Sequence, residues 1–234
     1  MQTHSQAPSN AQHRAGIQAM FDLVAPRYDL MNDLMSMGTH RLWKRLVARR
    51  AAQSDKALAV DLAGGTGDIA RLLHQRGWQV VVCDPSVAMM QSGGPTPPDI
   101  TWVAGVGEGL PFSSESIDLL TVGFGLRNMT DANTALDEIL RVLKPGGRVL
   151  CLEFSTPAPW LAPFYNWYSA HIIPRLGAMI AGRREAYRYL VDSIREFPDQ
   201  QTLKALMEEV GFCDVSFENL SFGIAALHIG QKPT

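Results

Sequence analysis

The chain is poor in the residues that build disulfide frameworks and metal centres. Its 234 residues include three cysteines, Cys83, Cys151 and Cys213, and each stands alone in an apolar, strand-like run. Isolated thiols of this kind are typical of buried cysteines in a reducing compartment. The six histidines show none of the short spacings that present metal ligands. We therefore expect neither disulfides nor a bound metal.

Strong charge of one sign and long apolar runs are also missing. A net charge of -2 gives no reason to expect nucleic acid as a partner. No apolar run reaches the length of about 20 residues that a transmembrane helix needs. Residues 1–15 are polar, which excludes a signal peptide there and predicts a disordered leader. These features favour a cytoplasmic protein and leave peripheral contact with the inner face of a membrane open.

The middle of the sequence alternates apolar runs with helical segments. We expect helices from 69 to 76, from Ser86 and over 131–143, and a turn at residues 144–147 (Lys-Pro-Gly-Gly). This alternation predicts a parallel sheet with helices on both faces, within one domain over 16–234. The expected strands are residues 57–62, 79–83, 100–104, 117–122 and 148–153.

The two ends of the chain have a different pattern. Residues 16–55 predict an N-terminal helical lid that breaks at 36–39, around Gly38. Residues 155–200 are aromatic-rich and predict a helical insertion on the substrate side, followed by a helix over 201–210. Two successive strands, 212–220 and 222–230, should form an antiparallel hairpin at the sheet edge, joined around Ser221.

A glycine-rich turn over residues 61–68 (Asp-Leu-Ala-Gly-Gly-Thr-Gly-Asp) follows the first expected strand. Glycines without a Cβ let the backbone turn sharply and approach a ligand closely. The N–H groups of the following helix face the same place. With Ala70, the turn fits the dinucleotide pattern G-x-G-x-x-G/A, and Asp84 lies where an acid would bind ribose hydroxyls. By itself this fingerprint supports either a nicotinamide cofactor or S-adenosyl-L-methionine (SAM), and a purely structural glycine turn is the third alternative.

Three features favour SAM. Asp61 lies inside the turn, where it would repel a pyrophosphate and attract the ammonium of a methionine. More than fifty residues precede the first strand, although dinucleotide-binding domains often begin near theirs. The terminal hairpin is not part of the usual six-stranded dinucleotide sheet.

The chain resembles the class I SAM-dependent methyltransferases, and more narrowly the ubiquinone/menaquinone biosynthesis C-methyltransferase family. The most specific matches are residues 28–33 (Tyr-Asp-Leu-Met-Asn-Asp) and 125–128 (Gly-Leu-Arg-Asn). Further matches are residues 40–45, 61–68, 141–147, 152–155, 187–190 and 197–200. The resemblance implies a Rossmann-like, mostly parallel seven-stranded sheet with an antiparallel C-terminal hairpin strand. It also implies methyl transfer to a ring carbon of a lipophilic, polyprenylated benzoquinol or naphthoquinol, by a homodimer or within a quinone-synthesis complex.

The expected site residues divide between cofactor and acceptor. Arg127 follows the fourth strand at the carboxyl edge of the sheet, where its fixed charge would stabilise a phenolate. Its alternative role is a salt bridge to Asp131 or Asp29, and Glu153 could pair with it. Asn128 would orient the loop or donate to a ring oxygen, or else cap a turn. Tyr28 would cover the methionine part of SAM, or else belong to the core. The residues expected at the cofactor are Asp61, Gly65, Thr66, Gly67, Asp84, Val106, Gly107 and Gly123.

Three of these residues, at two places in the sequence, depart from the family. Val106 and Gly107 replace an Asn or Asp followed by Ala near the adenine, and Gly123 replaces a serine. Each lost neutral hydrogen bond is worth about 0.5–1.5 kcal/mol. The departures keep two rival functions open: methylation of another small aromatic acceptor, and a non-catalytic SAM-fold subunit of a quinone-synthesis complex.

Overall fold

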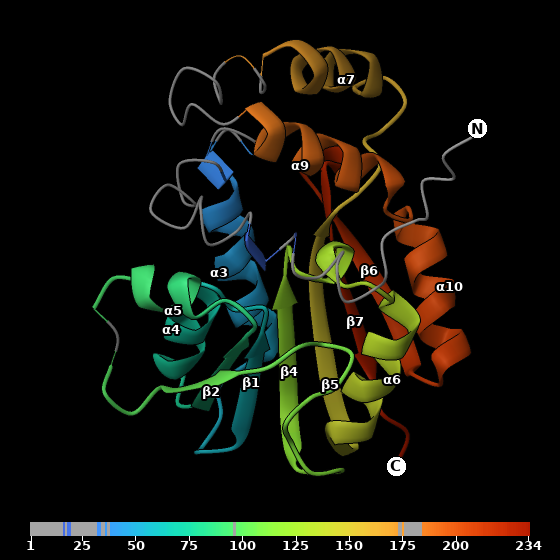
Figure 1. Cartoon of the computed structure of the whole chain (residues 1–234). Helices are drawn as coiled ribbons and strands as arrows, with labels where there is room; N and C mark the ends of the chain where they lie inside the picture. Colours follow the sequence, from blue (N-terminus) through green and yellow to red (C-terminus); the bar gives the residue numbers. More distant parts are fainter. Residues whose placement is uncertain are drawn as a thin grey trace, which may run out of the picture.

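A seven-stranded sheet forms the centre of the molecule (Figure 1). The strand order is β3-β2-β1-β4-β5-β7-β6, and only β7 runs antiparallel to its neighbours. The strands are β1 (Leu58–Leu62), β2 (Gln79–Asp84), β3 (Thr101–Ala104), β4 (Ile117–Gly123), β5 (Leu143–Phe154), β6 (Cys213–Leu220) and β7 (Ala225–Gln231). The expected fold class is confirmed, including the terminal hairpin.

The structure is a computed structural model that describes residues 16, 18–19, 32–33, 36, 38–95, 97–172, 175 and 184–234, with the backbone alone at 184–188 and 190. The expected leader over 1–15 and the candidate Tyr28 lie outside these residues. The helices are α3 (His40–Ala51), α4 (Asp68–His74), α5 (Val87–Ser92), α6 (Ala132–Val142), α7 (Ala162–His171), α9 (Arg184–Glu196) and α10 (Gln200–Val210), with short 3-10 turns η2 (Leu126–Asn128) and η3 (Ser221–Gly223).

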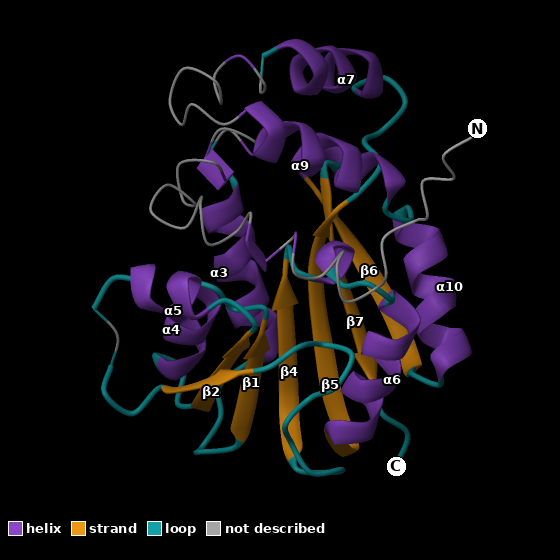
Figure 2. Cartoon of the chain, viewed as in Figure 1, coloured by secondary structure: helices purple, strands orange, loops and turns teal. Residues whose placement is uncertain are grey.

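Helices cover both faces of the sheet and bury a core on each (Figure 2). Leu119 and Leu120 are neighbours in β4, both fully buried, and they belong to opposite layers. Leu119 packs on the layer that contains α3 and α4, and Leu120 packs on the layer that contains α6 and α10. A strand with two buried faces has a continuous apolar sequence, which is why these runs are so evident in the chain.

Local sequence signals set several boundaries. Gly38 has a φ of +76° and α3 begins two residues later, so the expected break is confirmed. Strand β5 begins at Leu143, and the expected turn over 144–147 is therefore wrong in part. Gly146 does take a left-handed φ of +76°, but the segment stays in the sheet. Leu143 pairs with Ile117, and the Gly146 N–H donates to the Lys232 carbonyl.

The carboxyl ends of the parallel strands point toward α9 and α7 (Figure 1). Cys83 and Cys151 are buried, and burial raises the pKa of the Cys83 thiol to about 12. Cys213 is half-buried. Within the described ranges, no helix combines the length and the apolar character needed to cross a bilayer.

Candidate functional site

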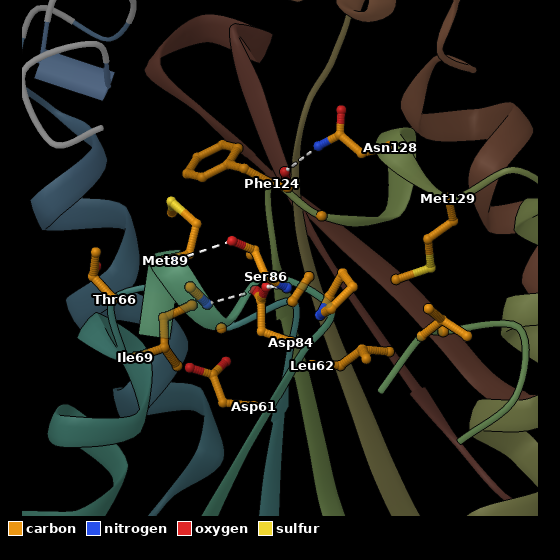
Figure 3. Close-up of a pocket in the computed structure, with 18 of the residues that line it drawn as sticks. Asp61, Leu62, Thr66, Ile69, Asp84, Ser86, Met89, Phe124, Asn128 and Met129 are labelled. Carbon is orange, nitrogen blue, oxygen red and sulfur yellow. Dashed lines mark hydrogen bonds between the residues drawn. The ribbon is translucent and has the colours of Figure 1, made fainter. Parts of the chain in front are cut away.

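A deep cavity lies at the carboxyl ends of β1, β2 and β4 (Figure 3). It holds about 1040 Å³ of space, part of which is open to solvent. Its walls come from segments far apart in the sequence. They are Gln18, Lys44, residues 61–66, Asp68, Ile69, residues 84–86, Met89, residues 106–108, residues 123–125, Asn128 and Met129. Open α/β sheets bind their ligands at this edge.

The glycine-rich turn forms the floor of the cavity. Ala63, Gly65 and Gly67 have positive φ angles of 50°, 52° and 79°, and the Ala63 N–H donates to the Cys83 carbonyl over 2.7 Å. A Cβ on Gly64 would lie 2.9 Å from the Asp61 carbonyl oxygen and from a Val82 methyl. The turn therefore depends on glycine for its close packing. Gly67 begins α4 and does not line the cavity.

Asp61 is a buried carboxylate at the floor. Its Oδ1 accepts from the Thr121 hydroxyl over 2.7 Å and its Oδ2 from the Ala70 N–H over 3.0 Å. Burial raises the pKa of Asp61 to about 7, although these two hydrogen bonds oppose the shift. Each carboxylate oxygen can accept a second hydrogen bond. Asp61 can therefore meet a cationic group of a ligand, and it does so best when ionised.

Asp84 holds the turn from the next strand. Its Oδ2 accepts from the Gly65 N–H and its Oδ1 from the Ser86 N–H, both over 2.8 Å. The side chain is buried and lines the cavity. Thr66 lines the same wall. Asp61 and Asp84 thus bring two carboxylates to one cavity from the ends of neighbouring strands.

An ion pair between a buried lysine and a half-buried aspartate, which the sequence did not reveal, closes one side of the cavity. The Lys44 ammonium lies 2.7 Å from Oδ2 of Asp68, and its side chain is 9% exposed. Asp68 also pairs with Arg71. Lys44 comes from α3 and Asp68 from the start of α4, so only tertiary packing joins them. The nearby Lys44 charge lowers the pKa of Asp61 and acts against its desolvation.

The turn after β4 is strained. Phe124 is a buried aromatic residue with a φ of 59°, a conformation that non-glycine residues rarely adopt. Its carbonyl accepts from Nη1 of Arg127 over 2.6 Å and from the Asn128 amide over 3.1 Å. A Cβ on the next residue, Gly125, would lie 2.5 Å from the Ala63 Cβ. Strained backbone held by several contacts is common at functional sites.

Arg127 is buried behind this turn. Its side chain is 2% exposed, and Nη1 lies 2.8 Å from Oε2 of Glu153, whose side chain is 1% exposed. The guanidinium packs over the rings of Phe124 and Phe154, and Nε has no hydrogen-bond partner among the described residues. Arg127 does not line the cavity at the ends of β1, β2 and β4 but a separate one between η2 and α9.

Asn128 is the residue of this segment that reaches the cavity (Figure 3). Its Oδ1 accepts from the Tyr189 hydroxyl of α9 over 3.3 Å. Burial raises the pKa of Tyr189, and the Arg127 charge opposes that shift. Asn128 therefore connects the cavity wall to α9.

The comparison with known sequences decides the family. A sequence model of the ubiE/COQ5 methyltransferase family matches residues 8–232.

The chain belongs to the ubiE/COQ5 methyltransferase family.

It is 54% identical over 217 residues to the ubiquinone/menaquinone biosynthesis C-methyltransferase UbiE of Rubrivivax gelatinosus, an alignment that covers 92% of this chain and 86% of that protein. A crystal structure of a SAM-dependent methyltransferase from Thermotoga maritima is similar, with a TM-score of 0.66, 18% identity, and coverage of 92% and 99% of the two chains. The [4+2]-cyclase SpnF is also similar, with a TM-score of 0.68, 17% identity and 97% coverage of both chains. Similarity at this level shows the fold, and the reaction has to be argued from the site.

In this ubiE/COQ5-family methyltransferase, larger neighbours fill the space beside the two departures. A Cβ on Gly123 would lie 2.6 Å from Cδ1 of Ile69, and one on Gly107 would lie 2.4 Å from the Met129 sulfur. Apolar side chains thus occupy the space that the Cβ atoms of the serine and alanine in the family pattern would need. Val106, Gly107 and Gly123 all line the cavity as expected.

The remaining candidates of this methyltransferase divide as follows. Among the described residues, no group of three or more His, Cys, Asp or Glu side chains could hold a metal ion. Arg127 pairs with Glu153, one of the partners considered from the sequence, and its role in catalysis stays a prediction. Residues that sequence reasoning missed at the cavity are Gln18, Lys44, Asp68, Ile69, Met89, Glu108, Phe124 and Met129. In the sequence these residues look like ordinary core or surface positions, so no local signal marks them as part of a site.

Proposed function

We propose that this chain transfers the methyl group of SAM to a ring carbon of a lipophilic quinol, in the biosynthesis of ubiquinone or menaquinone. Membership of the methyltransferase family makes the chain a SAM-dependent enzyme. The observation that carries the proposal is the meeting of Asp61, Asp84 and Asn128 in one cavity. The relative from Rubrivivax gelatinosus is named for C-methylation in ubiquinone and menaquinone biosynthesis, which supports the acceptor class.

The residues around the cavity suit SAM. Asp61 can accept a hydrogen bond from the ammonium, and Asp84 can accept from the ribose hydroxyls. The glycine-rich turn offers backbone N–H groups and close approach. Pro85, Met89 and Val106 provide an apolar wall for the adenine. Bound SAM supplies an electrophilic methyl group.

The acceptor requires alignment and charge stabilisation. A quinol carbon becomes a good nucleophile as a ring hydroxyl loses its proton, and in-line geometry lowers the barrier by several kcal/mol. We place Asn128 against the acceptor, because it lines the cavity, and Arg127 behind it as the fixed positive charge. The guanidinium supplies a fixed positive charge, so Arg127 favours the phenolate without acting as a base. Glu153 and the Phe124 carbonyl hold the guanidinium in place.

The acceptor can be identified with labelled SAM. The chain is incubated with demethylmenaquinol and, separately, with 2-methoxy-6-polyprenyl-1,4-benzoquinol, and mass spectrometry locates the label. We expect label on a ring carbon of at least one of them. Label on oxygen would reject C-methylation, and absence of label from both would reject the quinol acceptor.

The role of Arg127 can be separated from cofactor binding. Removing a charge that stabilises an oxyanion typically lowers kcat by about 100-fold or more. Arg127→Ala should therefore lower kcat by that factor and change the calorimetric Kd for SAM by less than about threefold. A large loss of SAM affinity with little loss of kcat would move Arg127 to the cofactor site.

A further inference from the structure

Helix α7 presents a stripe of aromatic side chains to solvent. Trp160, which lies just before the helix, Phe164 and Trp167 are 66%, 60% and 53% exposed. Their spacing of four and three residues places them on one face of the helix. Tyr165 and Ser169 lie on the opposite face and are buried. One side of the helix therefore packs against the protein, and its outer side exposes aromatic side chains to solvent.

A fourth exposed aromatic residue joins the stripe from the β6–β7 turn. Phe222 is 66% exposed, and its ring centroid lies 5.1 Å from that of Trp160. Its backbone has a φ of 59°, between Ser221 at 47° and Gly223 at 88°. A bulky residue rarely adopts this conformation, and here it places the ring in solvent. Burial in the core does not account for this arrangement, so the aromatic patch (Trp160, Phe164, Trp167 and Phe222) calls for a partner.

The sequence around the patch is free of acidic residues. The chain has 23 Asp and Glu residues, but none occurs in residues 155–184, which contain Arg175, Arg183 and Arg184. Arg175 is exposed and donates to the His171 carbonyl at the end of α7 over 2.9 Å. A segment that carries exposed aromatic residues and basic residues but no acidic ones complements an anionic lipid surface.

The basic residues of α3 are a weaker candidate for the same partner. Arg41 lies 2.9 Å from Asp33, and Arg50 lies 2.6 Å from Glu218. Lys44 is buried against Asp68. Acidic neighbours therefore offset much of the charge on that helix.

The patch lies on the side of the molecule that suits a lipophilic acceptor. Helix α7 lies beyond α9, on the side to which the carboxyl ends of the strands point (Figure 1). Its inner face lines a cavity of about 730 Å³, partly open to solvent, through Tyr165, Asn166 and Ser169, opposite Val191 and Ile194 of α9. One helix thus separates an internal cavity from the exposed aromatic patch.

We propose that the aromatic patch inserts into the interface of a lipid bilayer that contains anionic lipids. Tryptophan suits this depth, because its ring is apolar and its N–H remains near water. The reason for membrane binding rests on the proposed function, because a polyprenyl quinol stays in lipid and the enzyme has to take it from there. The insertion itself is a property of the surface and can be measured without turnover.

The test is sedimentation of the full chain with vesicles of phosphatidylcholine and phosphatidylglycerol in a 3:1 ratio, and with vesicles of phosphatidylcholine alone. We expect binding to the mixed vesicles that weakens as salt rises. A variant with all four patch residues changed to serine should bind more than about tenfold more weakly. The matched control is Leu42→Ser on α3, which removes an apolar side chain that is also 60% exposed, and it should bind like the parent chain.

Any of three results with vesicles would overturn the proposal: no binding of the parent chain to mixed vesicles, equal binding by the four-serine variant, or an equal loss in Leu42→Ser. Sedimentation velocity without lipid is run in parallel. A dimer of the parent chain that the four-serine variant abolishes would assign the patch to a second copy and reject the bilayer.

Circular dichroism and thermal unfolding check that the four-serine variant is folded, and Trp160→Ser with Phe222→Ser provides a milder variant. A failure of the proposed function can be told from a failure of the membrane proposal. In the first case no quinol is labelled in detergent, although the chain still binds vesicles. If both hold, the four-serine variant should keep its activity on a short-chain quinol in solution and lose activity on a long-chain quinol in vesicles.

Discussion

Asp61 should make the affinity for SAM depend on pH below neutrality. Burial raises the pKa of its carboxyl to about 7, and Asp61 lines the cavity. An ammonium gains from the ionised carboxylate and not from the neutral acid. With a pKa of about 7, the ionised fraction falls about eightfold from pH 7.5 to pH 6, and about 80-fold to pH 5. The Kd for SAM should rise by the same factors, up to about 2.6 kcal/mol of binding free energy.

The stability of the ligand-free chain should follow pH in the opposite direction. An unfolded Asp has a pKa near its ordinary value of 3.8, so between about pH 4 and 7 the folded chain holds a proton that the unfolded chain has released. Stability from this group is fully present below pH 4 and is lost as the pH rises through 7. Asp61 thus favours SAM binding where it favours folding least.

Isothermal titration calorimetry from pH 5 to pH 8.5 measures the affinity. The free α-amino group of the ligand limits the range, since its pKa of about 7.7–8.0 should lower affinity again at the alkaline end. In Asp61→Asn the acidic limb should disappear and the affinity should be low throughout. Asp118→Asn is the control, because Asp118 pairs with Lys144 outside the cavity. A flat parent profile, or an unchanged acidic limb in Asp61→Asn, would refute the role of Asp61.

Three further predictions concern packing, two of them at the site and one in the turn before β2. Arg127→Met should lower the free energy of unfolding in urea by about 3–5 kcal/mol, because it leaves Glu153 buried and unpaired. The double variant Arg127→Met with Glu153→Leu should recover most of that stability and still have a low kcat. A double variant with normal activity would count against catalysis by Arg127. Gly123→Ser should weaken SAM binding, because the new side chain would displace Ile69. Adding Ile69→Ala should recover part of the lost affinity in a double-mutant cycle measured by calorimetry. Strictly additive effects of the two substitutions would contradict this coupling. Gly77→Ala should lower the free energy of unfolding in urea by more than about 2 kcal/mol. The new Cβ would lie 2.2 Å from the Ser54 carbonyl oxygen, and residue 77 has a φ of +88°. A smaller effect would show that this turn adapts to the extra atom.

The sequence predicted the sheet well, and it predicted that two acids lie at one edge of that sheet. Buried parallel strands are continuous apolar runs, and a glycine-rich turn after the first strand places its own acid at the sheet edge. Asp61 and Asp84 could therefore be placed together, and the structure puts both in one cavity. The β6–β7 hairpin was equally predictable, because two strand patterns joined around Ser221 leave room only for a tight connection.

The acceptor side was less predictable. Arg127 could be placed at the carboxyl edge, but Glu153 lies 26 residues further on, and its distance from Arg127 depends on how β4 and β5 align. The start of β5 was misplaced because glycine and proline favour turns locally, while pairing with Ile117 and Lys232 keeps the segment in the sheet.

Sequence alone determined the order of strands and helices, the family resemblance and the glycine-rich turn, since these depend on local spacing and residue type. Only the tertiary structure decided which charges are buried together, as in Arg127 with Glu153, and which aromatic residues remain exposed on α7. The physical reason is that burial and electrostatic pairing depend on distances in space. Residues far apart along the chain acquire those distances only when the helices pack against the sheet.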